Sequence, residues 1–206
     1  MKHTDGTQVK SRKVAQGEAT REALLAAAQE LFGARGYAET SLEQIVLAAG
    51  VTKGALYHHF GGKEEIFRAV FQSVKQQLSR VVSEAQWTPE PWTALLAGCR
   101  TFIEAHTDPG VQRIVLVDAR AVLSWEAWRD VDSQYGTVVL RSALRRAINH
   151  GLIEPQPLNA LATILSGSLT EACMLVANAT DEEAARIEAI EIVERLLEGL
   201  RAAPRV

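Results

Sequence analysis

The stretch TSLEQIVLAAGVTKGALYHHFGGK, residues 40–63, decides the fold of this chain. Its order of apolar and polar residues predicts two short helices joined by a tight turn. A capping box can start the first helix in either of two ways, as Thr40 with Glu43 or as Ser41 with Gln44. Either box places the apolar residues that follow on one inward face of the helix.

The middle of this stretch predicts the turn and the second helix. Gly50 is expected to end the first helix, because glycine enters the left-handed conformation without steric cost. Thr52 can cap the second helix, in which Leu56 and Phe60 lie four residues apart and would pack inward. Gly54 lacks a side chain and would let the backbone approach another molecule closely. The outer side keeps hydrogen-bond donors, namely Thr52, Lys53, Tyr57 and His58.

Donors of this kind suit phosphate oxygens and base edges. The whole pattern is therefore typical of a helix-turn-helix that places its second helix in the major groove of DNA. The competing interpretation is an ordinary turn between two core helices. It is disfavoured because a cap, a glycine turn, a polar outer face and aromatic anchors coincide within one short stretch.

The same residues resemble the tetracycline-repressor (TetR) family of bacterial regulators, whose pattern runs T-x-x-x-I-A-x-x-A-G-V-[ST]-x-G-[ST]-L-Y-x-H-F-x-x-K. The resemblance covers roughly residues 18–70, with Val46 and Ala55 as departures from the pattern. The matching positions are Thr40 or Ser41, Ile45, Ala49, Gly50, Val51, Thr52, Gly54, Leu56, Tyr57, His59, Phe60 and Lys63.

The resemblance implies a role for each outer residue of the second helix. Thr52 and Lys53 would face bases or phosphates, and Tyr57 and His58 would touch the sugar-phosphate backbone. Lys63 would meet a phosphate at the N-terminus of the next helix, where the helix dipole favours an anion. The expected DNA-contacting set is Thr40, Ser41, Thr52, Lys53, Gly54, Tyr57, His58 and Lys63.

Composition fits a protein that meets DNA at one end only. The chain has 206 residues, of which 47% are hydrophobic, enough for a sizeable core. Residues 1–80 carry eleven Lys/Arg and eight Asp/Glu, a balance of +3, and the rest carry eleven and seventeen, a balance of −6. A weakly basic N-terminal part and an acidic C-terminal part agree with DNA binding by the N-terminal part.

The remaining composition predicts a cytoplasmic protein without cofactor or metal. Cys99 and Cys173 are far apart and lack metal-ligand spacing, which is typical of buried thiols in a reducing compartment. The N-terminus lacks an apolar signal core. No uninterrupted apolar run approaches membrane-spanning length, so no membrane partner is expected.

The chain is expected to be all-α, with about nine helices in three parts. Residues 1–17 are predicted to be a flexible arm, residues 18–63 a three-helix DNA-binding domain, and residues 64–206 a helical ligand-binding and dimerisation domain. Thr20 is expected to cap the first helix, and Thr180 the last. The arm either reaches phosphates or a minor groove, or is a solvated tail. Its basic residues are Lys10, Arg12 and Lys13.

The predicted helix over roughly Leu158 to Ala177 is apolar nearly all round, with Glu171 as its one formal charge. Such a helix must be covered on nearly all sides. We expect it to pair, together with the final helix, with the same helices of a second chain, and the resemblance implies the same four-helix interface. Burial within one chain is the alternative. The expected interface residues are Leu161, Leu165, Ser168, Leu169, Ala172, Val176, Val193 and Leu197.

The resemblance also implies a pocket in the helical body for a small-molecule effector, here an apolar or aromatic one. Residues that could line it are Cys99, Phe102, His106, Asp118, Trp125, Trp128, Tyr135 and Met174. Ordinary core packing is the alternative for each. The function implied is a ligand-responsive transcriptional repressor that binds a palindromic operator as a dimer. Activation stays open, because the sign of regulation depends on operator position.

Enzyme motifs are weak by comparison. Gly62-Lys63 resembles the end of a phosphate-binding loop, but Glu64 follows where Ser or Thr is needed. His58 and His59 are adjacent and would project about 100° apart on a helix, so they do not form a metal-binding pair. No catalytic residue is therefore expected. A ligand carrier without DNA binding is disfavoured by the basic and tyrosine residues on the outer face.

Overall fold

The computed structural model describes residues 5–202, with side chains described from residue 14, and over this range the chain is helical without a named strand. The elements are α1 (Asp5–Glu39), α2 (Leu42–Ala49), α3 (Lys53–His59), α4 (Lys63–Ala85), α5 (Pro91–Ala105), α6 (Pro109–Val111), η1 (Gln112–Asp118), α7 (Ala119–Val122), α8 (Trp125–Asn149), α9 (Leu158–Ala177) and α10 (Glu182–Glu198). Because α6, the π-helical η1 and α7 follow without a break, they form one irregular helix. The all-α prediction of about nine helices is confirmed.

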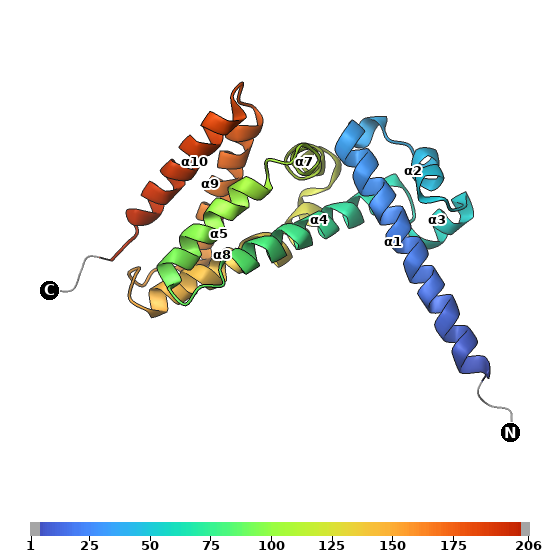
Figure 1. Ribbon diagram of the computed structural model, residues 1–206, viewed down its shortest axis with the longest axis horizontal. Helices are drawn as coiled ribbons and strands as arrows, with labels where there is room; N and C mark the ends of the chain where they lie inside the picture. The colour runs from blue at the N-terminus through green and yellow to red at the C-terminus, as the bar shows by residue number, and fades with distance from the viewer. Residues whose placement is uncertain (1–4, 203–206) are drawn as a thin grey trace.

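The helices form a small head at one end and a larger body at the other (Figure 1). Helices α1, α2 and α3 make the head, and the long α4 runs from it into the body beside α5 and α8. Helices α9 and α10 pack against each other at the far side of the body, away from α2 and α3. Any signal between the two ends must therefore pass through α4 or through the α6–η1–α7 segment.

The head is held to α4 by aromatic packing. Phe32 and Tyr37 of α1 each lie with ring centroids 5.1 Å from that of Phe67 in α4, both in edge-to-face arrangements. Phe32 and Phe67 are completely buried. Edge-to-face pairs of this kind add stability beyond the area they bury. They fix the orientation of the head on the first turns of α4.

Helix α1 differs from the prediction at both ends. It begins at Asp5, so the part of the predicted arm from residue 5 onward is helical, while residues 1–4 lie outside the described range. The expected cap at Thr20 is wrong: Thr20 lies within the helix, and its hydroxyl donates to the Gln16 carbonyl at 2.9 Å. Near its other end the helix is broken at Gly36, whose φ of 83° is in the left-handed region that favours glycine.

The start of α10 is also one residue from its predicted place. Asp181, not Thr180, is the N-cap, and its carboxylate accepts from the Ala184 N–H at 3.0 Å. Aspartate offers a charge-assisted cap that the helix dipole favours. Two further helices begin at side-chain caps: Ser124 for α8 and Asp108 for α6, whose oxygens accept from the backbone N–H groups of Ala127 and Val111.

Helix α9 is the one helix in the described range that is long and apolar enough to cross a membrane by length and composition alone. The sequence did not suggest such a span. Only 22% of this stretch is buried within the chain, so most of its apolar surface must be buried by contacts outside the chain. Polar residues interrupt it, among them Thr163, Ser168 and the exposed Glu171.

Candidate nucleic-acid interface and effector cavity

The start of α2 is set by one of the two predicted capping boxes. The Ser41 hydroxyl accepts from the Gln44 N–H at 3.2 Å, and the Gln44 side chain accepts from the Ser41 N–H at 2.8 Å. Thr40 has turned inward instead: it is 1% exposed and its hydroxyl donates to the Gly36 carbonyl at 2.8 Å. The expected DNA contact from Thr40 is therefore wrong, because its hydroxyl closes the break in α1.

The turn between α2 and α3 has the predicted geometry. Gly50 has φ 65° and ψ 29°, the left-handed conformation that ends α2. Thr52 is the N-cap of α3, with its hydroxyl oxygen accepting from the Ala55 N–H at 3.2 Å. An oxygen that accepts in this way still carries its own hydrogen, so the Thr52 hydroxyl keeps a donor for a second partner.

Helix α3 has one buried and one exposed side. Leu56 is completely buried and Phe60 is 3% exposed, with the Arg21 guanidinium 5.5 Å above the Phe60 ring. His59 is half-buried and faces α1 at Gly17, which agrees with a structural role. The exposed side consists of Thr52, Lys53, Gly54, Tyr57 and His58. These are the residues expected to contact DNA from this helix.

Lys53 has an intramolecular partner that the sequence did not reveal. Its ammonium lies 2.6 Å from the Glu43 carboxylate of α2, and both side chains are more than half exposed. The hydrogen bond from Lys53 lowers the pKa of Glu43, and the same bond raises the pKa of Lys53. Lys53 must therefore leave Glu43, or bring a carboxylate with it, to contact a phosphate.

Lys63 is placed at the first turn of α4, close to the head. Its ammonium donates to the Ala38 carbonyl at 3.2 Å and lies 4.3 Å from the centroid of the Tyr37 ring. The neighbouring Glu65 carboxylate accepts from the Gly61 N–H at 2.6 Å. Lys63 thus supplies a half-buried positive charge beside the helix N-terminus, where an anion would be favoured.

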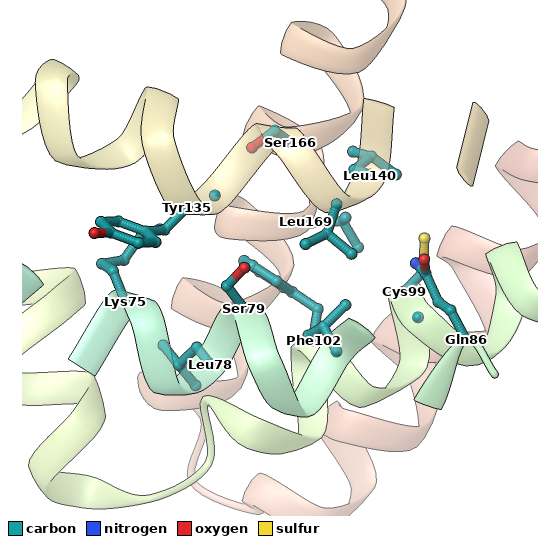
Figure 2. A pocket seen from close by; sticks show the side chains of 14 residues that line it. Lys75, Leu78, Ser79, Gln86, Cys99, Phe102, Tyr135, Leu140, Ser166 and Leu169 are labelled. Carbon is teal, nitrogen blue, oxygen red and sulfur yellow. The ribbon is translucent and has the colours of Figure 1, made fainter. Parts of the chain in front are cut away.

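Two of the hollows in the described part of the body are lined by residues that the sequence assigned to one pocket. The first, here the inner cavity, measures about 20 Å³ and lies between α4, α5, α8 and α9 (Figure 2). The second, here the outer groove, measures about 490 Å³ and lies along α7, α8 and α9. Cys99, Phe102 and Tyr135 line the inner cavity, while Trp125 and Trp128 line the outer groove.

The other three predicted pocket residues line neither hollow. The Asp118 carboxylate accepts from the backbone N–H of Tyr37 at 2.7 Å. His106 is buried, with Nδ1 2.7 Å from the Phe102 carbonyl, so Nδ1 carries the hydrogen. Met174 is a half-buried part of the core. For these three the alternative of ordinary structural packing is the correct one.

A largely buried ion pair joins one residue of each hollow. The Lys75 ammonium of α4 lies 2.8 Å from the Asp132 carboxylate of α8, with the side chains 7% and 20% exposed. Lys75 lines the inner cavity and Asp132 lines the outer groove. Gly136 makes room for the pair, since a Cβ there would lie 2.5 Å from Asp132 Oδ1 and 3.1 Å from Lys75 Nζ. None of these three residues was singled out in the sequence.

The two cysteines are unreactive by their surroundings. Burial raises the pKa of the Cys99 thiol to about 12, and that of the Cys173 thiol to about 12 as well. A thiol that stays protonated is a poor nucleophile and a poor metal ligand. Both residues are free of disulfides, as the sequence predicted.

The head meets the α6–η1 segment at a close joint. Besides the Asp118 contact, the Arg113 guanidinium donates to the Ala34 carbonyl at 2.7 Å. The two backbones approach so closely that a Cβ on Gly33 would lie 3.1 Å from the Gly110 Cα. Because η1 continues into α7, this joint connects the C-terminal end of α1 to one wall of the outer groove.

The exposed face of α9 and α10 differs from the predicted interface. Four of the eight expected residues, Leu169, Val176, Val193 and Leu197, are buried within the chain. Their helices turn that face toward the body. The apolar residues left exposed are instead Ile164, Leu175, Ile187, Ile192 and Leu196.

Comparison with known proteins identifies both halves of the chain. A family model described as "Tetracyclin repressor-like, C-terminal domain" matches residues 92–200, and one described as "Bacterial regulatory proteins, tetR family" matches residues 24–70. The crystal structure of a TetR-family transcriptional regulator from Pectobacterium atrosepticum has a TM-score of 0.79 and 33% identity, covering 93% of this chain and 98% of that one.

Two curated relatives are similar over different extents. The HTH-type transcriptional regulator SrpR of Pseudomonas putida is 40% identical over 79 residues, which span 38% of this chain and 35% of that protein. The transposon Tn10 TetC protein of Escherichia coli is 22% identical over 150 residues, which span 73% of this chain and 76% of that protein. Of these two relatives, the one with the higher identity thus matches the shorter part of the chain.

Proposed function

Because this chain belongs to the TetR family of bacterial transcriptional regulators, we propose that it is a ligand-responsive repressor that binds a palindromic operator as a dimer. The family is one of transcriptional regulators and not of enzymes. Residues 18–63 serve as the DNA-binding domain and residues 64–206 as the ligand-binding and dimerisation domain. The protein acts in the cytoplasm, the compartment that holds bacterial DNA.

The observation that carries this proposal is the exposed side of α3. Leu56 and Phe60 anchor the helix inward, which leaves only polar groups and a glycine facing out. Lys53 and Thr52 lie at the first turn, where a recognition helix contacts base edges. Gly54 lets the helix backbone approach the duplex.

Contacts to the sugar-phosphate backbone would come from both sides of α3. Tyr57 is 51% exposed and offers its hydroxyl, and His58 lies beside it. Ser41 at the start of α2 is half-buried, and Lys63 adds charge at the start of α4. Such contacts fix the register of the protein on DNA but carry little sequence information.

A second copy of the chain would cover the exposed face of α9 and α10. Ile164 is 67% exposed and Leu175 is 56% exposed, far more than the core residues of the same helix. Glu171 and Ser168 lie among them and are unsuited to lipid. A two-fold pair would present two α3 helices to successive major grooves, about 34–36 Å apart or somewhat more, which requires a near-palindromic operator.

An apolar or aromatic effector bound in the body would release the operator. The effect of the bound effector can reach the head through the joint between α1 and η1, because η1 continues into α7, which lines the outer groove. The effector must have different affinities for the DNA-bound and free arrangements of the heads. Repression follows if the operator overlaps the site of polymerase.

The test is selection of bound duplexes from fragmented genomic DNA, followed by gel shifts with the enriched site. Tyr57→Ala should weaken binding to every duplex, because it removes a backbone contact. Arg145→Ala is a matched control, since Arg145 is exposed on α8 in the body. No enrichment of any near-palindromic site, or equal binding by both variants, would reject the proposal.

A further inference from the structure

Two oppositely charged side chains, Lys75 and Asp132, lie where the inner cavity and the outer groove come close to each other. Lys75 faces the cavity from α4 and Asp132 faces the groove from α8, with 2.8 Å between their charged atoms. Ser166 of α9 lines both hollows. The ion pair thus contributes one charged residue to the lining of each hollow.

Lys75 is not fully satisfied by its partner. An ammonium has three N–H donors, and among the described residues one hydrogen bond is found, to Asp132 Oδ1. The side chain is 93% buried, as 7% of it is exposed, so water has little access to the other two donors. A buried ammonium in this state favours a further oxygen acceptor, above all a charged one.

The outer groove carries excess positive charge. Its charged lining residues are Arg120, Arg129 and Asp132, and the charge of Asp132 is matched by Lys75. Arg129 lies 5.3 Å above the Trp125 ring, and Arg120 lies 5.8 Å above the Trp128 ring. Guanidinium groups held on aromatic faces attract and orient anions that carry an apolar body.

The inner cavity suits an apolar body but must widen to accept one. Figure 2 shows Lys75 and Tyr135 at one end and Gln86 and Cys99 at the other, with Leu78, Phe102 and Leu169 between them. Its present volume of about 20 Å³ holds little more than a water molecule. The Gln86 side chain lies directly against Gly98, so a rotation of Gln86 would open that end.

We propose that the effector is an organic anion, an apolar or aromatic body with one acidic group, and that its acidic group replaces Asp132 on Lys75. The body then occupies the widened inner cavity. Asp132 has a second partner ready, because Arg129 lies three residues before it on the same helix and lines the same groove. After the exchange Lys75 is paired with the acidic group of the effector, and Asp132 is paired with Arg129. No buried charge is left without a partner, which would be strongly destabilising.

This proposal rests on the proposed ligand response and narrows it to one chemical class. A cationic ligand bound by Asp132 would be the opposite outcome. The positive balance of the groove disfavours that outcome, because a cation would approach Arg120 and Arg129 before reaching Asp132.

The test uses two fluorescent probes with one skeleton. One is 1-anilinonaphthalene-8-sulfonate, an aromatic anion, and the other is N-phenyl-1-naphthylamine, which lacks the sulfonate. Their binding to the full-length protein is titrated by fluorescence, with and without operator DNA. Wild type should bind the anion about tenfold more tightly or better, the expected worth of a hydrogen bond to a charged group.

Three variants locate the anion site. Asp132→Asn removes the competing carboxylate and should tighten binding of the anionic probe further. The double variant Lys75→Met with Asp132→Asn removes both charges, so no buried charge is orphaned, and should reduce the preference for the anion to about twofold or less. Arg145→Gln removes an exposed charge elsewhere on α8 and should leave the preference unchanged. Circular dichroism confirms that each variant is folded.

The outcomes separate this inference from the function on which it rests. If the neutral probe binds as well as the anion and releases operator DNA, the ligand response stands and the anion class is wrong. If the double variant keeps the preference of wild type, Lys75 is not the anion site. If neither probe binds or affects DNA, both the proposed effector site and this inference fail.

Discussion

The carboxylate of Asp118 accepts a hydrogen bond from the backbone N–H of Tyr37 at 2.7 Å, and this contact joins the body to the head. Tyr37 directly follows Gly36, where α1 is broken and its regular hydrogen bonding is interrupted. Asp118 thus accepts the Tyr37 N–H in place of the backbone carbonyl that a regular helix would provide. It is the last residue of η1, so a shift of η1 must move or break this bond.

Asp118→Ala is expected to lower the free energy of unfolding by about 1–3 kcal/mol, the cost of losing a partly buried hydrogen bond to a charged group. Urea denaturation of the variant and wild type measures it. The control is Asp130→Ala, because Asp130 is exposed and lies 3.9 Å from Arg68. Its effect should stay within about 0.5 kcal/mol. Equal losses in the two variants would contradict a special role for Asp118.

Glu43→Gln should strengthen binding to all duplexes and steepen its salt dependence. Glu43 holds the Lys53 ammonium at 2.6 Å and also carries negative charge toward DNA. Once Lys53 is free to neutralise a phosphate, the slope of log K against log salt should grow by up to about 0.9. Gel shifts at four salt concentrations measure the slope. Glu188→Gln, an exposed change in α10, is the control, and an unchanged slope for Glu43→Gln refutes the idea.

Ile164→Arg is expected to split the proposed dimer, because the side chain is 67% exposed on the apolar face of α9. A buried arginine without a partner would cost several kcal/mol in the interface. Analytical ultracentrifugation gives the mass. Leu47→Arg is matched to it as an equally large change at an 83% exposed apolar residue in the head. A dimeric Ile164→Arg variant would show that this face is not the interface.

His106 is expected to make the protein less stable as the pH falls from 6.5 toward 4. Burial lowers the pKa of His106 from 6.5 to about 4, so the folded protein keeps it neutral while the unfolded chain binds a proton. Stability is therefore full above pH 6.5 and is lost progressively on acidification, by about 2 kcal/mol at pH 5. The nearby Lys75 charge acts in the same direction.

Chemical denaturation of wild type and His106→Asn at pH 7 and pH 5 tests this. Asparagine keeps a donor for the Phe102 carbonyl but does not titrate. The variant should lose less stability between the two pH values than wild type. Identical losses would show that His106 does not contribute. His150→Asn serves as the exposed control, because Nδ1 of His150 lies 2.9 Å from the Arg146 carbonyl in the same local arrangement.

Gly136→Ala should destabilise the protein by about 1–3 kcal/mol, although alanine is the better helix former. The added methyl group would meet Asp132 Oδ1 at 2.5 Å and Lys75 Nζ at 3.1 Å. Thermal or urea unfolding measures the effect. Gly54→Ala is the matched change in α3, where the nearest atom would be 4.0 Å away, and it should gain up to about 1 kcal/mol. A stabilised Gly136→Ala variant would show that Lys75 and Asp132 can move away from the added methyl group at little cost in free energy.

The sequence predicts the head well because its signals are local. The box of Ser41 with Gln44, the turn at Gly50 and the cap at Thr52 each depend on residues within four positions. The side of α3 that faces out follows from Leu56 and Phe60 alone. Local hydrogen bonding and helical periodicity are enough to fix such features.

Features that depend on packing between distant helices were missed. Lys75 and Asp132 are 57 residues apart, and Asp118 and Tyr37 are 81 apart, so no local pattern pairs them. Helix α9 is apolar nearly all round, which left the sequence without a way to choose its inward side. Leu169 was therefore placed at the surface, although it is 5% exposed. The π-helical η1 also has no signature in its residues.

The close approach of Gly33 to Gly110 has an evolutionary consequence. Because a Cβ on Gly33 would lie 3.1 Å from the Gly110 Cα, backbone alone sets the spacing of α1 and α6. The two positions are therefore coupled in what they tolerate. Among descendants of this chain, drift at one should be accompanied by compensation at the other, and lineages that keep both glycines should keep the same geometry between the head and η1.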